Sequence, residues 1–301
     1  MKGVKPVIFG EVLFDIFSAD KKVLGGAPFN VAWNLKGFGF DPLFISRVGN
    51  DSLGSEIKDI ASNWGLDTNG IQTDSTHPTG TVAITFDEIS HTFDIKSDQA
   101  YDRIDGEKAL VEVNNGNPEV LYFGTLAIRE SCSHAALERL LTQNIPAFVD
   151  INLREPWWTI DLVNQALRHA TWLKLNDDEL LLIRKQLINS PENEDLQQSL
   201  HKLKDRFNLS QVILTCGEQG AYLLDDDGCF FQAPPTEVKI VDTIGAGDAF
   251  SSVVIAGLLL QWRSEVVLPR ALEFAAAVCT LPGATCLEKE FYKGFSQSWL
   301  S

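Results

Sequence analysis

The stretch Asp242–Phe250 reads DTIGAGDAF and lies between a β-branched run that ends at Val241 and a long apolar run that ends at Trp262. A glycine-rich turn in this position predicts the start of a helix. Gly245 and Gly247 can adopt backbone angles that are closed to other residues, so successive amide groups can point at one place. Such converging amides attract anions, above all phosphate.

Asp248 is a carboxylate beside this predicted anion site, where it would repel a phosphate. Two interpretations are open. An Asp in the first turn of a helix is favoured by the helix dipole whatever the function of the protein. Alternatively, Asp248 accepts a proton from a hydroxyl while the amides neutralise the phosphoryl group that the hydroxyl attacks, as a kinase site requires.

The composition of the 301 residues is that of a globular protein in water, and the formal net charge is -16. General binding to nucleic acid or to an anionic membrane is therefore not expected. No uninterrupted apolar stretch of about 18 residues occurs, so no membrane span is expected. The five cysteines show no metal-binding spacing, and reduced thiols in the cytoplasm fit them best.

Strand and helix patterns alternate beyond Glu119, which predicts an α/β fold with a mostly parallel sheet covered by helices on both faces. Ligands of such sheets gather beyond the carboxyl ends of the strands. Polar residues follow three of the predicted strands at this end, namely Asp150, Asn152, Arg154, Asn176, Glu179, Thr215 and Gly217.

Asn176 and Glu179 are three residues apart at the predicted start of a helix. Their oxygens could hold Mg2+ directly or through water, but the same spacing also forms a capping box. Thr215, Gly217 and Gly220 lie in the segment TCGEQG after a strand. A nucleotide's phosphate or ribose could approach this turn, and an ordinary β-turn is the alternative.

The segment PVIFGEVLFDIF from Pro6 predicts a first strand in which Glu11 and Asp15 are acidic residues among apolar ones. Buried carboxylates need partners. Two interpretations stay open from the residues alone. Glu11 and Asp15 either share a solvent-facing side of the strand, or Asp15 points into a polar site that holds the hydroxyls of a ligand.

Gly25 and Gly26 precede a helix that is expected from about Pro28, with Asn30 in its first turn. The glycines could let the backbone approach a ligand closely, and the Asn30 amide could then bind that ligand. In the alternative interpretation, the glycines only form a turn and Asn30 faces water.

Residues 79–104 have an alternating pattern that predicts a small antiparallel unit, with Asp87, Glu88 and Ser90 at its turn. We predict that this unit forms a lid together with residues of about 11–24. A β appendage without a lid function is the alternative.

Several common site motifs are absent. The sequence has no GxxxxGK[ST] motif, and neither GFGF at Gly37 nor GAGDAF at Gly245 completes GxGxxG. Neither GxSxG nor HExxH occurs, and the five histidines do not cluster. Walker-type, dinucleotide-binding and hydrolase functions therefore lose most of their support.

Three segments together resemble the ribokinase-like sugar kinases of the phosphofructokinase-B type. They are GGAPFNVA at Gly25, KLNDDE at Lys174 and DTIGAGDAF at Asp242. Within that family the chain is most similar to bacterial fructokinases, through FDIKSDQAYD at Phe93, YFGTLAIR at Tyr122 and DINLREPWW at Asp150.

The resemblance implies a ribokinase-like three-layer sandwich over residues 1–301 as a single domain. Its central sheet would be mostly parallel, with helices on both faces and a small antiparallel β lid. The implied activity is transfer of the γ-phosphate of ATP to a small sugar, with D-fructose as the first candidate. Kinases of 2-keto-3-deoxygluconate, ribose or nucleosides, and a catalytically silent sugar-binding regulator, are the alternatives.

The resemblance also implies a role for each candidate residue. Asp248 would be the catalytic base, and the amides of Gly245, Ala246 and Gly247 would form the anion hole. The remaining assignments are sugar binding by Asp15, Gly26, Asn30 and Arg154; nucleotide contacts by Asn176, Thr215, Gly217 and Gly220; Mg2+ organised, mainly indirectly, by Asn176 and Glu179; and a monovalent cation such as K+ at Asp242. A homodimer through the lid is a further expectation.

Overall fold

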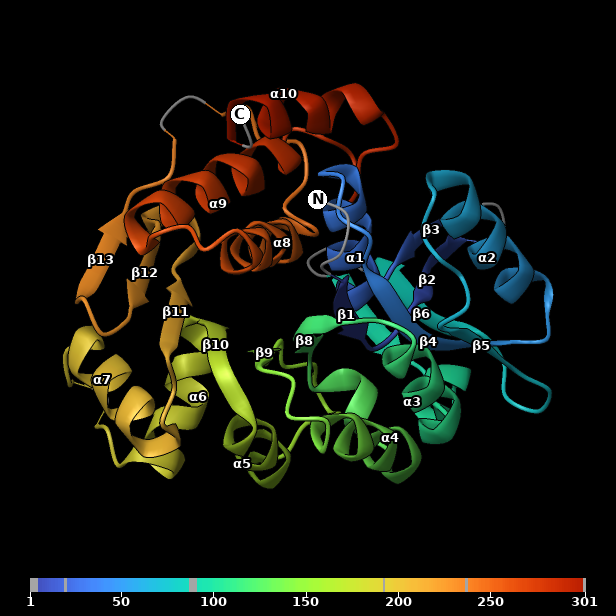
Figure 1. Ribbon diagram of the computed structural model, residues 1–301, viewed down its shortest axis with the longest axis horizontal. Helices are drawn as coiled ribbons and strands as arrows, with labels where there is room; N and C mark the ends of the chain where they lie inside the picture. The colour runs from blue at the N-terminus through green and yellow to red at the C-terminus, as the bar shows by residue number, and fades with distance from the viewer. Residues whose placement is uncertain (1–4, 19–20, 87–90, 192, 236–237, 300–301) are drawn as a thin grey trace. The chain divides into compact units, whose positions relative to one another are not determined.

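The computed structural model describes residues 5–18, 21–86, 91–191, 193–235 and 238–299. The chain forms two compact units, whose helices and strands are labelled in Figure 1. The first unit is built from the chain up to Pro118, residues 127–143 and the segment from Thr285, and the second from residues 119–126 and 144–284.

The second unit has the α/β organisation that the alternating pattern predicts. Its strands are ordered β13-β12-β11-β10-β9-β8; β8 to β11 run parallel, and β12 and β13 pair antiparallel. Helices α8 and α9 cover one face and α5, α6 and α7 the other (Figure 1). The strands are β8 Pro118–Phe123, β9 Ala147–Asp150, β10 Ala170–Asn176, β11 Gln211–Thr215, β12 Ala221–Leu224 and β13 Cys229–Gln232. The helices are α5 Ile160–Arg168, α6 Asp177–Ile188, α7 Leu196–Phe207, α8 Ala246–Leu259 and α9 Ser264–Val278, and short 3-10 turns cover Leu126–Ile128 and Gly217–Gln219.

The parallel strands of this unit are buried because helices cover both faces of the sheet. Leu173 on β10 and Val212, Ile213 and Leu214 on β11 are fully shielded from solvent. Helix α5 begins at a polar cap, where the Thr159 hydroxyl accepts a hydrogen bond from the Leu162 amide. Local capping and the apolar pattern therefore agree.

The first unit contains a second group of parallel strands in the order β1-β4-β5. Helices α1 and α3 lie on opposite sides of these strands (Figure 1), and α1 also contacts α2 and α10. The bounds are β1 Lys5–Phe9, β4 Leu43–Gly49, β5 Ile71–Asp74, α1 Ala27–Gly37, α2 Ser52–Trp64, α3 Gly106–Asn114, α4 Ser131–Leu141 and α10 Lys289–Trp299, with a 3-10 turn η1 at Ala100–Arg103.

The predicted small sheet is present in the first unit. It is ordered β3-β2-β6-β7, with β2 Leu13–Ser18, β3 Lys21–Gly25, β6 Gly80–Phe86 and β7 His91–Ile95. The outer pairs β2–β3 and β6–β7 are antiparallel, whereas the central pair β2–β6 is parallel. The predicted turn residues Asp87, Glu88 and Ser90 lie outside the described residues.

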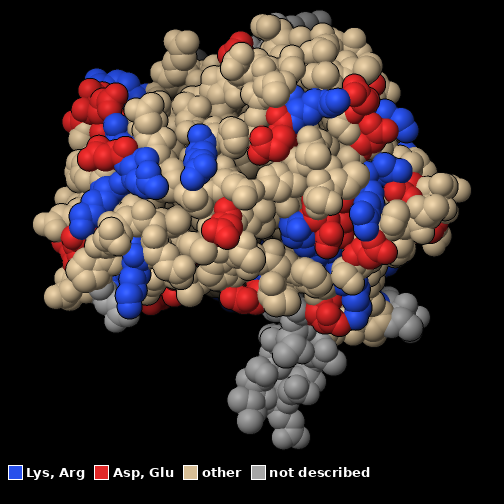
Figure 2. All heavy atoms as spheres, turned by 90° about the horizontal axis from the view of Figure 1, so that it is seen from below, with Lys and Arg blue, Asp and Glu red and all other residues tan. Residues whose placement is uncertain are grey.

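Charges of both signs are mixed on the surface. On the face drawn in Figure 2, Lys and Arg side chains lie beside Asp and Glu side chains and do not gather in one basic area. Among the residues that the structure describes, no helix has the length and apolar character that crossing a membrane requires.

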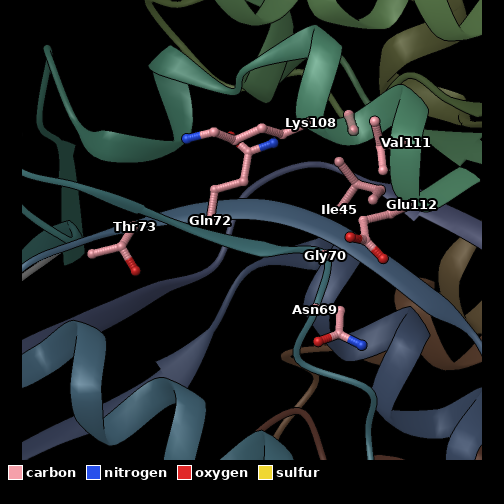
Figure 3. A pocket seen from close by; sticks show the side chains of 9 residues that line it. Ile45, Asn69, Gly70, Gln72, Thr73, Lys108, Val111 and Glu112 are labelled. Atoms are coloured by element: carbon pink, nitrogen blue, oxygen red, sulfur yellow. The ribbon is translucent and has the colours of Figure 1, made fainter.

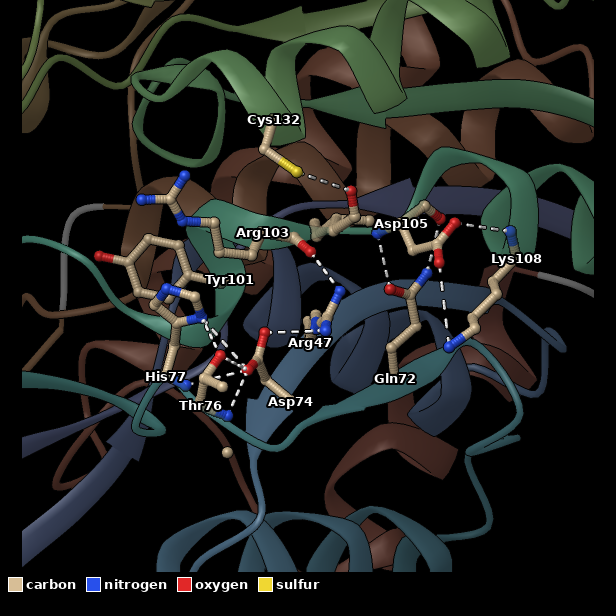
Figure 4. Close-up of polar contacts among 12 residues, drawn as sticks. Arg47, Gln72, Asp74, Thr76, His77, Tyr101, Arg103, Asp105, Lys108 and Cys132 are labelled. Carbon is tan, nitrogen blue, oxygen red and sulfur yellow. Dashed lines mark hydrogen bonds and ion pairs between the residues drawn. The ribbon is translucent and has the colours of Figure 1, made fainter.

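A buried carboxylate joins the end of β5 to the chain that follows it (Figure 4). Asp74 is 2% exposed and accepts hydrogen bonds from the Thr76 amide and hydroxyl and from the His77 amide. The Arg47 guanidinium lies 2.8 Å from its other oxygen. Burial alone would raise the pKa of Asp74, but these hydrogen bonds hold it far below the ordinary value.

Replacing Asp74 by Asn should therefore destabilise the protein in a pH-dependent way. A carboxyl whose pKa is lowered by folding adds stability above its unfolded pKa of 3.8 and loses this contribution as the pH falls below that value. At pH 7 we expect Asp74→Asn to lower the free energy of unfolding by about 2 kcal/mol. Urea unfolding at pH 7 and pH 3 measures the difference, which should shrink at the lower pH.

Asp98→Asn is the matched control, because Asp98 approaches the other side of His77 but its side chain is 62% exposed. Its removal should cost much less at either pH. An equal loss for the two variants, or a loss at Asp74 that does not depend on pH, would contradict this interpretation of the cluster.

Candidate active site

The glycine turn opens α8 as the sequence predicts. Gly245 is the N-cap residue and has a φ of 81°, in the left-handed region. A Cβ atom on Gly245 would lie 2.4 Å from the Cβ of Ala284, so both the backbone angle and the close packing require glycine. Ala246, Gly247 and Asp248 then form the first turn of the helix, where amides have no partner four residues earlier within the helix.

The predicted anion hole is partly engaged with the protein itself. The Ala246 amide points to the Thr243 carbonyl oxygen at 3.3 Å, which is a long hydrogen bond. Asp248 is half-buried in the same turn. The geometry thus places a carboxylate and a helix N-terminus side by side, and the anion hole stays a prediction.

Three strands of the second unit end at one edge of the sheet. On β10, Lys174 is the register partner of Asp150 on β9, and Asn176 is the partner of Thr215 on β11. The structure therefore brings these strand ends together, as expected for parallel neighbours.

A buried ion pair at this edge also contacts α8. Lys174 Nζ lies 3.1 and 3.0 Å from the two carboxylate oxygens of Asp150, and the Ser251 hydroxyl donates to the same carboxylate at 2.9 Å. Lys174 is 6% exposed and Asp150 is fully buried. The pair links β9 and β10 to α8, one turn beyond Asp248.

Lys174 and Ser251 were not among the candidate site residues predicted from the sequence. A signal for Lys174 was present, because a lysine between Leu173 and Leu175 interrupts a run that should be buried on both faces of a parallel sheet. A buried lysine needs a carboxylate. The pattern could not identify Ser251, since serine in an apolar helix often bonds only to its own backbone.

Asn176 and Glu179 form the capping box that was the structural alternative. The Asn176 side-chain oxygen accepts from the Glu179 amide at 2.7 Å, and Glu179 accepts from the Asn176 amide at 2.8 Å. The second Glu179 oxygen accepts from the Leu153 amide at 2.8 Å. Burial raises the pKa of Glu179, which is 5% exposed.

Both carboxylate oxygens of Glu179 accept backbone hydrogen bonds, and this arrangement fits Mg2+ held through a water molecule. The metal role of Asn176 and Glu179 stays a prediction. Within the described ranges, no group of three or more His, Cys, Asp or Glu residues is arranged to hold a metal ion.

Both glycines in the turn after β11 have a positive φ, and close packing adds a second requirement for glycine at position 220. Gly220 has a φ of 110°, and a Cβ there would lie 2.2 Å from the Gln232 carbonyl oxygen. Gly217 has a φ of 51° and faces open space. The Thr215 hydroxyl contacts the Leu175 carbonyl oxygen at 3.4 Å. Open space at Gly217 is compatible with a bound nucleotide, whose position stays a prediction.

Asp242 ties the glycine loop to the segment after α9. Its carboxylate accepts from the Ile244 amide at 3.0 Å and from the Gly283 amide at 3.1 Å. The Val241 amide also donates to the Cys279 carbonyl oxygen at 2.8 Å. This explains Asp242 structurally, and its binding of a monovalent cation stays a prediction.

Arg154 lies beyond the carboxyl end of β9 and is exposed. Its guanidinium donates to the Leu153 carbonyl oxygen at 3.1 Å, and its own carbonyl accepts from the Trp157 amide at 2.7 Å. Since Glu179 holds the Leu153 amide, the segment that carries Arg154 is attached to the start of α6.

The remaining predicted residues belong to the first unit. Asp15 lies on β2, and a Cβ built on Gly25 would lie 3.1 Å from its carboxylate, so the two are neighbours. Gly26 is the N-cap of α1 with a φ of 108°, and its carbonyl accepts from the Asn30 amide at 2.9 Å. This unit thus brings Asp15, Gly26 and Asn30 to one region.

Two of the alternative interpretations, in which Asn30 or Glu11 faces solvent, are wrong. Asn30 does not face water, because it is only 4% exposed. Glu11 is 3% exposed and precedes β2, so it does not share a solvent-facing strand side with Asp15. The apolar neighbours of both residues in the sequence are consistent with this burial.

A separate pocket of about 360 Å3 lies at the edge of the first unit (Figure 3). It is bordered by β4, β5 and α3 and includes Gln72, Lys108 and Glu112. None of the predicted site residues lines it. The Gln72 side chain is used internally, since it bonds to both the amide and the carbonyl of Asp105.

Several known proteins are similar to this chain. A sequence model of the pfkB family carbohydrate kinases matches residues 13–290. A fructokinase of Klebsiella pneumoniae is 29% identical over 264 residues, covering 84% of this chain and 82% of the relative. A 5-dehydro-2-deoxygluconokinase of Clostridium botulinum is 26% identical over 269 residues, covering 85% and 77%.

The solved structure of a fructokinase with bound ATP from Xylella fastidiosa has a TM-score of 0.83, 19% identity and 99% coverage of both chains. This similarity confirms the predicted ribokinase-like fold. The family match extends from the small sheet to α10 and includes the glycine turn and Asp248. The chain therefore belongs to the PfkB family of carbohydrate kinases.

Proposed function

We propose that this sugar kinase transfers the γ-phosphate of ATP to a hydroxyl of D-fructose. The observation that carries the proposal is the start of α8, where a left-handed glycine opens the helix and Asp248 lies in its first turn. A helix N-terminus favours a phosphoryl group, and a carboxylate beside it can receive the proton of the attacking hydroxyl.

In the proposed reaction, the sugar hydroxyl gives its proton to the Asp248 carboxylate while its oxygen bonds to the γ-phosphorus. The bond from that phosphorus to the β-phosphate oxygen breaks, and ADP leaves with the electron pair. The amides of Gly245, Ala246 and Gly247 would donate to the transferred group. Positioning and charge stabilisation of this kind account for most of the catalysis in phosphoryl transfer.

The other predicted residues would hold the substrates and Mg2+. Asn176 and Glu179 would hold Mg2+ through its water shell, and the ion would neutralise charge on the nucleotide phosphates. The turn with Thr215, Gly217 and Gly220 would border the nucleotide. Sugar hydroxyls would bind to Asp15, Gly26 and Asn30, with Arg154 near the sugar or its phosphate.

D-Fructose is proposed because the fructokinase of Klebsiella pneumoniae is among the similar proteins and because the sequence resembles that subgroup. The Clostridium relative acts, by its name, on 5-dehydro-2-deoxygluconate, which is a sugar acid and not a neutral sugar such as fructose. We further propose that residues 1–301 act as one kinase domain, that the small sheet is a lid through which two copies pair, and that K+ binds near Asp242.

The first prediction concerns the base. Asp248→Asn keeps the shape of the side chain but cannot accept the proton, so kcat should fall about 10²- to 10⁴-fold. The thermal unfolding midpoint should be unchanged within experimental error. Coupled detection of ADP release measures the rate. Asp161→Asn is the control, because Asp161 is an exposed Asp in the first turn of α5 in the same unit. Normal turnover by Asp248→Asn would show that Asp248 is not the catalytic base.

The second prediction concerns the sugar. Purified protein with ATP, Mg2+ and K+ should release ADP with a higher kcat/KM for D-fructose than for ribose, 2-keto-3-deoxygluconate, 5-dehydro-2-deoxygluconate or nucleosides. A higher value for one of these would transfer the assignment to that substrate. Saturable sugar binding without ADP release, measured by calorimetry, would instead identify a silent sugar-binding regulator.

A further inference from the structure

Lys174 is the one charged side chain in the buried part of β10, and the proposed mechanism does not use it. Its neighbours Leu173 and Leu175 are fully buried, and Lys174 itself is 6% exposed. An ammonium group in this position is costly unless carboxylates surround it. The groups around Lys174 must therefore offset the cost of burying its charge.

The Lys174 side chain ends directly beneath the first turn of α8. A Cβ atom built on Gly247 would lie only 3.2 Å from Lys174 Nζ. Any residue larger than glycine at position 247 would press on the ammonium group.

Three carboxylates from three elements act on this ammonium. Asp150 on β9 bonds to it directly, and the charges of Glu179 on α6 and Asp248 on α8 act on it as well. Burial would lower the pKa of Lys174, but these carboxylates raise it above its ordinary value.

Ser251 completes the connection to the helix. It follows Asp248 by three residues and so lies on the same side of α8, and its hydroxyl donates to the Asp150 carboxylate at 2.9 Å. Buried polar contacts thus run from Lys174 through Asp150 to Ser251, and they connect the sheet to the helix that carries Asp248.

We propose that Lys174 is a positioning residue of the active site, which supports the first turn of α8 and supplies positive charge beneath a turn that must receive a phosphoryl group. This rests on the proposed function. Without the ammonium, the carboxylates of Asp150, Glu179 and Asp248 would leave the region strongly negative. A nearby positive charge favours the binding of an anion.

The test removes both charges of the ion pair together. Lys174→Met alone would leave the Asp150 carboxylate buried without its partner and could prevent folding. The double variant Lys174→Met/Asp150→Asn leaves the net charge unchanged and keeps a side-chain acceptor for Ser251. Its thermal unfolding midpoint is measured first, to establish that it folds.

Two measurements then follow on the double variant. We expect kcat to fall about tenfold or more, with the KM for the sugar nearly unchanged. The Kd for inorganic phosphate, measured by calorimetry, should rise several-fold. The reason is that the lost ammonium faces Gly247 in the first turn of α8, whereas the lost Asp150 carboxylate contacts Ser251 further along the helix.

Arg47→Met/Asp74→Asn is the matched control, because it removes another partly buried ion pair and also leaves the net charge unchanged. It should lower the unfolding midpoint without changing kcat or the Kd for phosphate. If both double variants behave alike, or if kcat and the Kd stay at their wild-type values, Lys174 is only a structural residue and the proposal fails.

The phosphate measurement separates this inference from the proposed function. A wild-type protein that phosphorylates none of the sugars tested would contradict the proposed function. The change in phosphate Kd between wild type and the Lys174→Met/Asp150→Asn variant would still decide the role of Lys174.

Discussion

The ion pair between Lys174 and Asp150 is the interaction on which the site of the second unit depends. Each partner would destabilise the fold by several kcal/mol if it were buried alone. Together they place an ammonium group below the first turn of α8 and a carboxylate that accepts from Ser251. The charge requirement of a buried lysine thus fixes two strands and a helix relative to one another.

The first unit satisfies a similar requirement at Arg129. Its guanidinium makes two hydrogen bonds of 2.8 Å to the fully buried Asp102 and a third to the Lys96 carbonyl oxygen. It also lies over the ring of Tyr101 at 5.2 Å. Burial lowers the pKa of Arg129, but the contacts with Asp102 more than offset this effect. The chain that leaves β7 is therefore attached to η1 and to the segment before α4.

The local sequence predicted the turns and helix starts of the site better than it predicted the contacts that these segments make with distant residues. Glycine at positions 245 and 26 indicated turns before helices, and both have positive φ. The spacing of Asn176 and Glu179 allowed a metal site or a capping box, and the box is formed. The double use of Glu179, which also accepts from the Leu153 amide, depends on a loop 26 residues away in the chain, which no local pattern can show.

The sequence by itself determined the α/β class, the start of α8 at a glycine that can adopt a left-handed angle, and the placement of polar residues at the ends of parallel strands. These features follow from backbone sterics and from the period of the apolar residues, which are local. Only the tertiary structure decided that Lys174 lies beneath Gly247 and that Asn30 is buried. Such facts depend on which side chains meet across strands and helices distant in the chain, and packing and charge compensation set them together.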